Sequence, residues 1–562
     1  MQDRSISIVF FLFLLAFAIN VVSITTWDMS HIANDGIQYI STAKNWLAGN
    51  GFATDTLMYT PHFQGNLPAA QTVWPNGYPF AIALLMKLGI EIHVASFTLN
   101  HLAHAMAAII MWLLLQKMGV GRFFATVCTF AFYCMSMPWA YVSAGMTEPV
   151  FTTLLLSALL FLPNPKHSTL PAWILCGAII AAAIYVRFST VFFAASTGTG
   201  IMLYLLLYER DRPAALITPF FKLALLVSLP TLAFGHLMYR TYTLIGTFDR
   251  YSGLKDPESF VSTLKLWIVV TSEQLGFSTT DLVGGKITNS LFLLFILLVA
   301  VIVLWFLLAQ RNVLRESPTD KSGVHLRVVG MVAVLHMLTM VTYLSYASMT
   351  SSPLEIISRY TYQIYPGLFA VFCFMTYTLF NRYSADGIQR STSAYRSLKG
   401  VVATLVALYL FAQINAAMVT RTHYFTQPKS ASQLMKMEVS NNTSLGDFIK
   451  ACFDKNSHIK SIWSTHGQSI HLHTGIPTLS HPHIYTKNPF SAKEFSKRAS
   501  DYNSGMFIFL DIPHLFDVRY DNYMSSAKDW IKNQGFTQLH LQNNRYAHNF
   551  TAEIYVLSLI HI

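Results

Sequence analysis

Charged side chains are scarce along this chain. Asp, Glu, Lys and Arg make up 12% of its 562 residues, whereas 53% are hydrophobic. A soluble chain carries roughly a quarter charged residues. The stretches 10–22 and 291–308 contain none at all, and the second is long enough to cross a bilayer. This scarcity excludes an ordinary soluble protein and predicts membrane-spanning helices.

Cysteine is also rare, with five in the whole chain. Cys128, Cys134, Cys176 and Cys373 lie in apolar runs and are typical of small buried hydrophobic residues. Cys452 stands alone in the more polar C-terminal part, so no disulfide is expected there. The absence of a CxxC pair argues against a zinc or redox centre of that type.

Two further features of nucleotide and nucleic-acid proteins are missing. The net charge is +11, but the basic residues lie in short loops between apolar runs rather than in a stripe interleaved with aromatic residues. That distribution is the positive-inside pattern of membrane proteins. No Gly-rich phosphate loop follows a predicted strand. We therefore expect no nucleic-acid partner.

The apolar runs predict about eleven membrane spans. The predicted spans are 6–25, 95–116, 122–140, 148–163, 171–186, 189–208, 221–238, 288–309, 328–347, 361–380 and 400–420. The first follows Arg4 and is not followed by a small-x-small cleavage site, so we interpret it as a retained span rather than a signal peptide.

Basic residues in alternate loops predict the orientation, with the N-terminus inside and the C-terminal part outside. The inner loops hold Lys117, Arg122, Lys166, Arg210, Arg212, Lys222, Arg311, Arg315, Lys321, Arg327, Arg382, Arg390, Arg396 and Lys399. We expect an integral, multi-pass protein of a bacterial cell (inner) membrane.

The predicted fold class is an α-helical polytopic membrane protein with outer-face juxtamembrane helices and a small C-terminal α/β extracytoplasmic domain. The membrane module is expected at 1–420, with a first outer loop at 27–94, and the outer domain at 421–562. Strand-like runs at 506–510 and 553–557 support an α/β domain. His471 and His473 are expected to alternate on another strand.

The first outer loop contains two short helical patterns. Asn34 and Asp35 can cap a helix that runs to Leu47 and stops at Gly49-Asn50-Gly51. A second helix is expected at 78–87, before Gly89. Both are too short to span a bilayer, so they should lie at the outer membrane surface.

Two carboxylates, Asp35 and Glu148, fall on the outer side beside membrane helices. A carboxylate near a low-dielectric wall can act as a general base. The alternative is structural, because acidic residues are common in the first turn of any helix. Both alternatives stay open for each residue.

Three arginines, Arg187, Arg240 and Arg359, lie at the outer membrane boundary. Outer-side arginines oppose the positive-inside trend and therefore need an anionic partner. A lipid phosphate would serve through forked hydrogen bonds. Snorkelling, or an ion pair with an acid such as Glu355, is the structural alternative.

The order of several short motifs resembles the GT-C superfamily of membrane glycosyltransferases, in the branch of the protein mannosyltransferases and the lipid A aminoarabinose transferases. The matching stretches are Asn-Asp-Gly-Ile-Gln-Tyr at 34–39, Trp-Pro-Asn-Gly-Tyr-Pro-Phe at 74–80, Thr-Glu-Pro-Val-Phe at 147–151, Arg-Thr-Tyr at 240–242 with Gly-Thr at 246–247, Arg-Tyr at 359–360 with Tyr-Pro at 365–366, and a segment at 464–482.

The resemblance implies a glycosyltransferase that moves a sugar from a polyprenyl-phosphate carrier to an acceptor on the outer membrane face. It implies that Asp35 is the base or orients the acceptor hydroxyl, and that positive charge stabilises the leaving phosphate, for which Arg187, Arg240 and Arg359 are the candidates. Glu148 is the second candidate catalytic residue. Tyr39, Trp74 and Tyr360 are the corresponding candidates for the sugar or acceptor pocket. The acceptor could be a lipid, a glycan or a protein. The sequence requires no cofactor, although some family members use a divalent metal.

The chain departs from the family pattern at two places. Many relatives carry Asp-Glu in the first loop, whereas Gly36 follows Asp35 here. The aminoarabinose branch uses a first-loop lysine for the carrier phosphate, but no Lys or Arg occurs between Lys44 and Lys87, which leaves His62 as the only candidate cation of that stretch.

Two other classes of function compete with a transferase. A lipid or polysaccharide transporter or flippase would place ionisable residues or broken helices at mid-membrane, and the predicted spans have few. A non-catalytic scaffold or receptor that binds a partner through its tail would leave the ordered first loop unexplained.

Overall fold

A computed structural model describes about half of the chain, chiefly the helices of its N-terminal two thirds. The described residues are 32–58, 67–133, 141–165, 167–208, 213–246, 259–263, 267, 321–350, 362–385, 449–451, 453–454, 462–464, 470–471, 474–480, 506–511, 536–539 and 551–557. The predicted spans 6–25, 288–309 and 400–420 lie outside these residues, as does Cys452.

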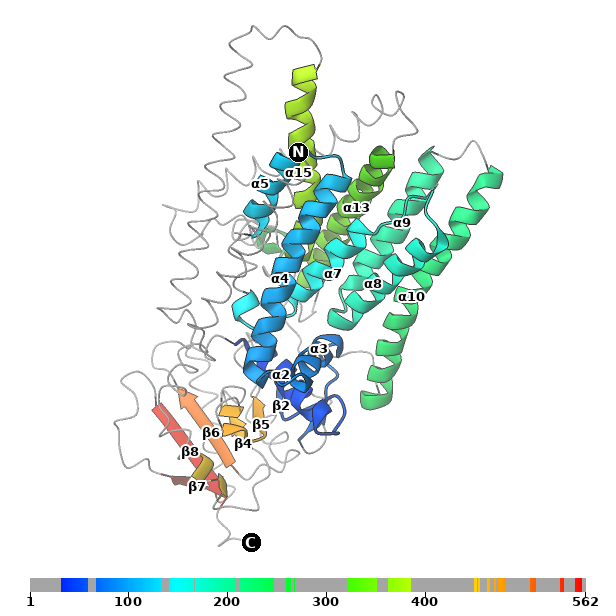
Figure 1. Ribbon diagram of the computed structural model, residues 1–562. Coiled ribbons are helices and arrows are strands. Elements are labelled where there is room, and N and C mark those ends of the chain that lie inside the picture. The colour runs from blue at the N-terminus through cyan, green and yellow to red at the C-terminus, as the bar shows by residue number, and fades with distance from the viewer. Residues whose placement is uncertain are drawn as a thin grey trace.

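The described part is mostly helical, and its long helices lie side by side as a bundle (Figure 1). They are α4 (Ile92–Lys117), α5 (Arg122–Tyr133), α7 (Glu148–Leu160), α8 (Leu170–Val186), α9 (Thr190–Tyr208), α10 (Pro213–Ile245), α13 (Lys321–Met349) and α15 (Tyr365–Ala385). Each coincides with a span predicted from the sequence.

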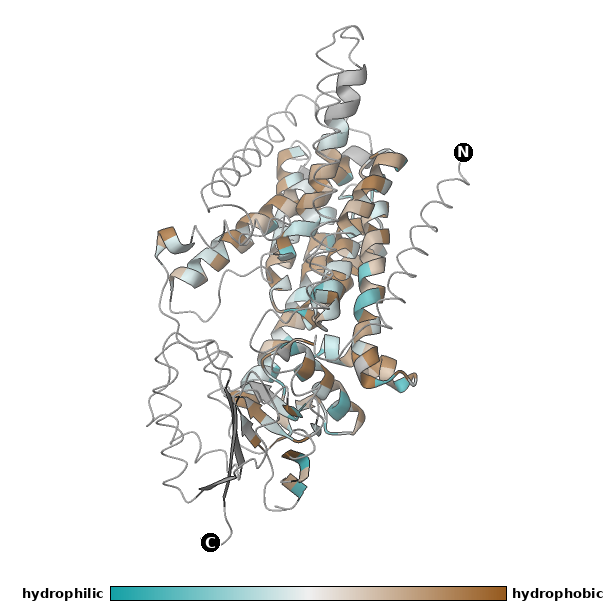
Figure 2. Cartoon of the chain, turned by 90° about the vertical axis from the view of Figure 1, so that its left-hand side faces the viewer, coloured by the Kyte–Doolittle hydropathy of each residue, from teal (hydrophilic) through white to brown (hydrophobic). Residues whose placement is uncertain are grey.

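Four of the described helices are long and apolar enough to cross a membrane, namely Val94–Lys117, Thr190–Tyr208, Ile217–Ile245 and Val324–Met349. The helices α7 and α8 are shorter, with 13 and 17 residues, against the roughly 20 that a full crossing needs. Figure 2 shows apolar residues along most of the bundle. The protein is therefore an integral membrane protein, although the full number of spans stays a prediction.

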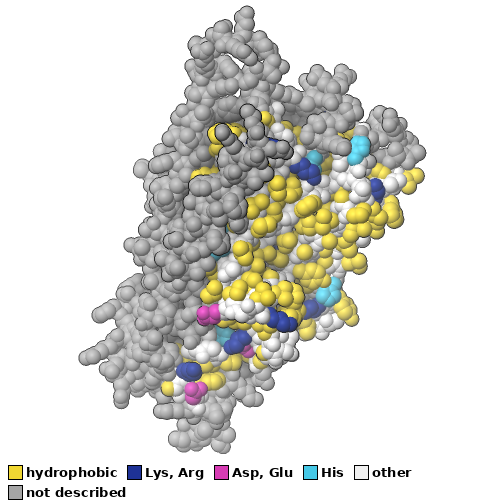
Figure 3. All heavy atoms as spheres, viewed as in Figure 1, with side chains coloured by type: hydrophobic (Ala, Val, Ile, Leu, Met, Phe, Trp, Pro, Cys, Tyr) yellow, Lys and Arg dark blue, Asp and Glu magenta, His cyan; other side chains and the backbone are white. Residues whose placement is uncertain are grey.

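Close contacts between helices hold the bundle together. At Gly177 of α8, a Cβ atom would lie 2.7 Å from the backbone oxygen of Leu226 in α10, so only glycine allows this approach. Such small residues at interfaces are typical of membrane helices. Large apolar side chains such as Leu102, Leu113 and Leu206 are exposed. Figure 3 shows a broad hydrophobic surface on the bundle. That surface fits contact with lipid.

The two short helices of the first loop are confirmed. They are α2 (Asn34–Leu47) and α3 (Gly77–Lys87), and they pack together at one end of the bundle (Figure 1). Gly49 and Gly89, which follow them, have φ of +86° and +90°, a conformation that favours glycine. Apolar side chains such as Tyr39 and Ile82 join the main core of the bundle.

The prediction that Asn34 and Asp35 cap α2 is wrong. The helix already includes both residues, and Ala33 is its N-cap, without a side-chain capping bond. Instead the Ala33 N–H donates to the backbone oxygen of Ala144, at 2.8 Å. The start of α2 is therefore fixed by the segment before α7, a tertiary contact that local sequence does not encode.

A mixed six-stranded sheet lies at the same end of the molecule as α2 and α3 (Figure 1). Its strand order is β2-β5-β4-β6-β8-β7, with β2 (Thr56–Met58), β4 (Ile462–Ser464), β5 (Thr478–Ser480), β6 (Met506–Asp511), β7 (Phe536–Leu539) and β8 (Thr551–Leu557). The first four strands of that order run parallel, and β8 is antiparallel to β6 and β7. The predicted strands at 506–510 and 553–557 are confirmed as β6 and β8.

The sheet takes its edge strand β2 from the first outer loop. Thr56 pairs with Thr478 in the parallel ladder, and their hydroxyls lie 3.2 Å apart. The same loop forms a small antiparallel pair, β1 (Ala53–Thr54) with β3 (Ala69–Ala70). The expected strand through His471 is wrong, because residues 470–471 and 474 are helical. His473 lies outside the described residues.

Candidate functional site

The start of α2, which carries Asp35, packs directly on the segment that leads into α7. A Cβ atom on Gly36 would lie 2.8 Å from the oxygen of Ala144 and 3.2 Å from that of Gly145. A glutamate, or any other side chain, at position 36 would therefore not fit here without movement of the backbone. Asp35 lies in the first turn of α2 and is half-buried.

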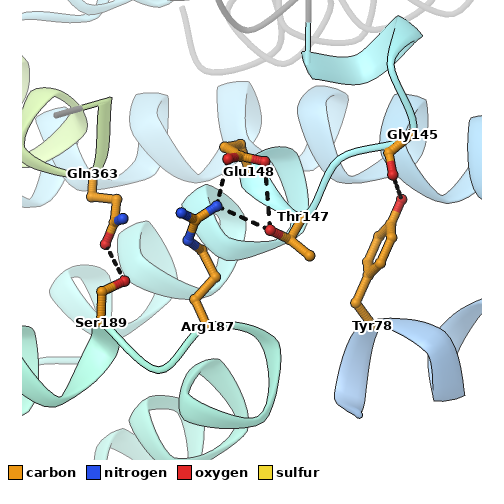
Figure 4. Close-up of polar contacts among 7 residues, drawn as sticks. All are labelled: Tyr78, Gly145, Thr147, Glu148, Arg187, Ser189 and Gln363. Carbon is orange, nitrogen blue, oxygen red and sulfur yellow. Dashed lines mark hydrogen bonds and ion pairs between the residues drawn. The ribbon is translucent and has the colours of Figure 1, made fainter. Parts of the chain in front are cut away.

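Glu148 and Arg187 form a buried ion pair at the same end of the bundle (Figure 4). Glu148 opens α7 and Arg187 follows α8, and their side chains are 0% and 7% exposed. Arg187 Nη1 donates to Glu148 Oε1 at 2.5 Å and to the hydroxyl of Thr147 at 3.0 Å. The two residues predicted to act separately, as an acid and as a phosphate ligand, therefore occupy one cluster.

Tyr78 of α3 joins three segments at this end. Its hydroxyl lies 3.0 Å from Asn100 Oδ1, 3.1 Å from the oxygen of Gly145 and 3.2 Å from the hydroxyl of Ser96. Burial raises the pKa of Tyr78, although hydrogen bonds to Ser96 and Asn100 oppose the shift. The residue therefore acts as a neutral hydrogen-bonding group that ties α3 to α4 and to the segment before α7 (Figure 4).

Tyr39 and Trp74, the candidate pocket residues, are in contact. Their ring centroids lie 6.2 Å apart, and Tyr39 also meets the Tyr78 ring at 5.1 Å, both edge to face. Tyr39 is almost fully buried, whereas Trp74 is half-buried. The structure thus brings together the aromatic residues of two separate motifs.

Arg240, near the end of α10, holds the first loop. Its Nη1 donates to the backbone oxygen of Gln71 at 2.8 Å.

On the other side of Arg187, the Ser189 hydroxyl donates to Gln363 Oε1 at 2.5 Å. This hydrogen bond joins the start of α9 to the short helix η2 (Tyr362–Ile364), as Figure 4 shows. The candidates Arg359, Tyr360 and His62 lie outside the described residues.

Asp55 connects α2 with the sheet. Its side chain accepts a hydrogen bond from Asn45 Nδ2 at 2.8 Å, and its N–H donates to the Ser41 hydroxyl at 2.8 Å. Its backbone oxygen accepts from the N–H of Thr478 at 2.9 Å. The helix that carries Asp35 is thereby anchored to the C-terminal strands.

Sequence reasoning missed several of these residues. Tyr78, Ser189 and Gln363 were not candidates, although Tyr78 lies inside the motif at 74–80 that pointed to the family. Ser189 and Gln363 lie 174 positions apart, and no local pattern relates them. Within the described part of the chain, no three His, Cys, Asp or Glu side chains gather as metal ligands would, so we assign no metal site.

Comparison with known proteins shows a fold that sequence comparison does not detect. No protein-family model and no curated protein matches the chain. Among solved structures, ArnT from Cupriavidus metallidurans, bound to undecaprenyl phosphate, has a TM-score of 0.53 at 11% identity and covers 97% of this chain and 98% of its own.

A second match is the oligosaccharyltransferase of Archaeoglobus fulgidus tethered to an acceptor peptide with the NVT sequon. Its TM-score is 0.50 at 10% identity, and the match covers 100% of this chain and 75% of that one. Both proteins are GT-C glycosyltransferases. The protein therefore has the fold of the GT-C membrane glycosyltransferases, and the predicted resemblance is confirmed at the level of fold.

Proposed function

We propose that the protein is a glycosyltransferase that moves a sugar from a polyprenyl-phosphate carrier to an acceptor on the outer face of the membrane. One observation carries the proposal: the candidate residues lie together at one end of a GT-C fold. They are Asp35, the ion pair of Glu148 with Arg187, and Arg240, which is hydrogen-bonded to the first loop. The solved ArnT holds undecaprenyl phosphate, which supports a lipid phosphate as the donor carrier here.

In the proposed reaction Asp35 accepts the proton of an acceptor hydroxyl as its oxygen attacks the anomeric carbon of the sugar. The bond from that carbon to the phosphate oxygen breaks, and polyprenyl phosphate leaves with the electron pair. General-base help of this kind contributes roughly a hundredfold or more in rate. Positive charge beside the leaving phosphate stabilises it, and Arg187, Arg240, Arg359 and His62 are the proposed sources.

The ion pair gives Glu148 and Arg187 linked roles in the proposal. Glu148 holds the guanidinium of Arg187 in one orientation, which leaves Asp35 as the stronger candidate for the base. Tyr39, Trp74 and Tyr360 are proposed to line the sugar or acceptor pocket. The proposed sugar is a hexose or a pentose, and the proposed acceptor is a lipid, a glycan or a protein.

The deciding experiment compares two donors. Purified protein in nanodiscs receives a defined undecaprenyl-phosphate sugar or the matching nucleotide sugar, and products are followed by mass spectrometry. We expect transfer only from the lipid donor. Replacing Arg359 by Ala should weaken donor use, and Lys should restore it only in part, since Lys lacks the planar fork. Transfer from the nucleotide sugar without carrier lipid would refute the proposal.

A flippase remains the competing function, and reconstitution distinguishes it. Within the described residues several basic side chains of the bundle stand at helix ends: Lys117 is the last residue of α4, and Arg122 and Lys321 are the first residues of α5 and α13. That placement favours chemistry at the surface over transport through the centre. Movement of labelled carrier lipid across proteoliposomes without any glycosyl transfer would favour the flippase.

The proposed location is a bacterial inner membrane with the C-terminal sheet on the outer side. A membrane-impermeant thiol reagent should then label Cys452 in spheroplasts. A cytoplasm-only reporter fused after Thr426 should be inactive, and an active fusion would reverse the orientation.

A further inference from the structure

Three buried side-chain amides of the first loop have polar atoms without a hydrogen-bond partner among the described residues. They are both polar atoms of Gln38, Nε2 of Gln71 and Oδ1 of Asn76. These side chains belong to residues that are 1%, 0% and 6% exposed. Buried polar groups in native proteins are nearly always paired, so this concentration calls for a ligand that supplies partners.

These polar atoms make no hydrogen bond within the local structure, although Oε1 of Gln71 does. Gln71 Oε1 accepts from the N–H of Val73 at 3.2 Å, which leaves its Nε2 as the spare donor. Asn76 is the N-cap of α3 and makes no side-chain capping bond, whereas a capping Asn ordinarily accepts from the first turn. Gln38 lies inside α2, where neither of its amide atoms takes part in the helix.

The three amides accompany the aromatic pair already described. Gln38 precedes Tyr39 on α2, and Gln71 and Asn76 lie on either side of Trp74 in sequence, with the two rings 6.2 Å apart. Gln38 also follows Asp35 by three positions, which places both residues on neighbouring parts of one helix side. Aromatic surface with a few directed polar groups is typical of a small-molecule subsite.

We propose that Gln38, Gln71 and Asn76 form a subsite that binds hydroxyl groups of the transferred sugar, a proposal that rests on the function proposed above. An amide carries a donor and an acceptor side by side, and it therefore complements two neighbouring hydroxyls. Gln38 supplies both atoms, Gln71 adds a donor and Asn76 an acceptor. The subsite distinguishes sugar-bearing carrier from bare carrier and places the sugar beside Asp35.

The test replaces Gln38 by Met, which keeps the length of the side chain and removes both polar atoms. Binding is measured by thermal shift in nanodiscs with bare undecaprenyl phosphate and with undecaprenyl phosphate bearing glucose, mannose, N-acetylglucosamine or arabinose. For the wild type we expect tighter binding of at least one sugar-bearing lipid than of the bare lipid. Gln38→Met should weaken that binding about tenfold and leave the bare lipid unchanged.

The stability of the ligand-free variant gives a second readout. Since Gln38→Met removes unpaired buried atoms, its melting temperature should equal or exceed that of the wild type. The matched control is Gln116→Met near the C-terminal end of α4, where the Nε2 of Gln116 donates to the backbone oxygen of Val120 at 2.9 Å. This control should leave the preference for sugar unchanged.

Three results would overturn the subsite. The first is equal affinity of the wild type for bare and sugar-bearing lipids. The second is a Gln38→Met variant with a lower melting temperature and an unchanged preference for sugar-bearing lipid, as expected if Gln38 has only a structural role or binds only water. The third is equal weakening for both lipids. Failure of the proposed function looks different: sugar-selective binding would persist while no glycosyl transfer occurs.

Discussion

Arg187 donates from one Nη1 nitrogen to Glu148 at 2.5 Å and to Thr147 at 3.0 Å, inside a part of the molecule closed to solvent. Each partner comes from the end of a different helix, so the pair fixes the start of α7 against the end of α8. A buried pair of this kind tolerates removal of both charges far better than removal of one.

Breaking this pair from one side should destabilise the protein. Glu148→Met leaves the Arg187 charge buried without its partner and should lower the free energy of unfolding by roughly 3 kcal/mol. The double variant Glu148→Met with Arg187→Met should recover most of that loss. Thermal unfolding of all four forms in detergent measures the coupling, and strictly additive losses would show that the pair contributes no coupling.

Replacing Asp35 by Asn should remove a proton acceptor while preserving shape. We expect turnover to fall by about a hundredfold or more with an unchanged melting temperature, as for loss of a general base. Asp55→Asn is the matched control, because an amide oxygen can still accept from Asn45 Nδ2, and its turnover should stay within about threefold of the wild type. Near-normal turnover of the Asp35 variant would make Asp35 a structural residue only.

The contact between α3 and α8 should tolerate no side chain at Gly77. A Cβ atom there would lie 2.6 Å from the backbone oxygen of Tyr185, so Gly77→Ala should cost about 1–3 kcal/mol and shift the first loop. Gly235→Ala in α10 is the control, because its Cβ would meet nothing within 4 Å and alanine favours helix. Equal melting temperatures for the two variants would contradict the packing.

His471 should make the stability of the sheet pH-dependent. Burial lowers the pKa of His471 and the charge of Lys44 adds to this, whereas the hydrogen bond to the Ile476 oxygen and the charge of Asp55 oppose it. A lowered folded-state pKa means that protons bind the unfolded chain more readily. The stabilisation is therefore complete above about pH 6.5 and is lost as the pH falls toward the folded pKa.

The measurement for His471 is hydrogen exchange of residues 475–480 between pH 7.5 and 5, corrected for intrinsic rates. Protection should decline over this range in the wild type. His471→Asn keeps a donor for the Ile476 oxygen, 2.8 Å from Nδ1, but cannot titrate, so its decline should be smaller. His236→Asn, at an exposed position in α10, is the control, and its decline in protection should match that of the wild type. Identical declines for all three proteins would exclude His471 as the source of the pH dependence.

Local patterns predicted the helices and not the contacts between them. The apolar runs and the glycines after α2 and α3 carry local signals, so α2, α3 and the long helices of the bundle each coincide with a prediction. The capping of α2 failed as a prediction because Ala144, far along the chain, supplies the partner. For the same reason the sequence did not show that Arg187 pairs with Glu148, which stands 39 positions away.

The sequence predicted at which end of the bundle the candidate residues lie, but it did not predict which of them contact one another. Asp35, Tyr39, Trp74, Glu148, Arg187 and Arg240 all lie at the end of the bundle that carries the first loop. Their pairing follows from helix packing, which depends on side-chain volumes and on close approaches such as that at Gly77. A single sequence records those volumes without showing which surfaces meet.

The parallel pairing of β2 with β5 has a consequence for how the protein is made. Thr56 and Thr478 are 422 positions apart, so β2 is synthesised long before its partner strand. Pairings of such high sequence separation form late, and until then β2 is an unpaired strand edge. The loop that carries Asp35 can therefore reach its final anchorage only after β5 has been synthesised, which makes synthesis of that C-terminal strand a condition for assembly of the candidate site.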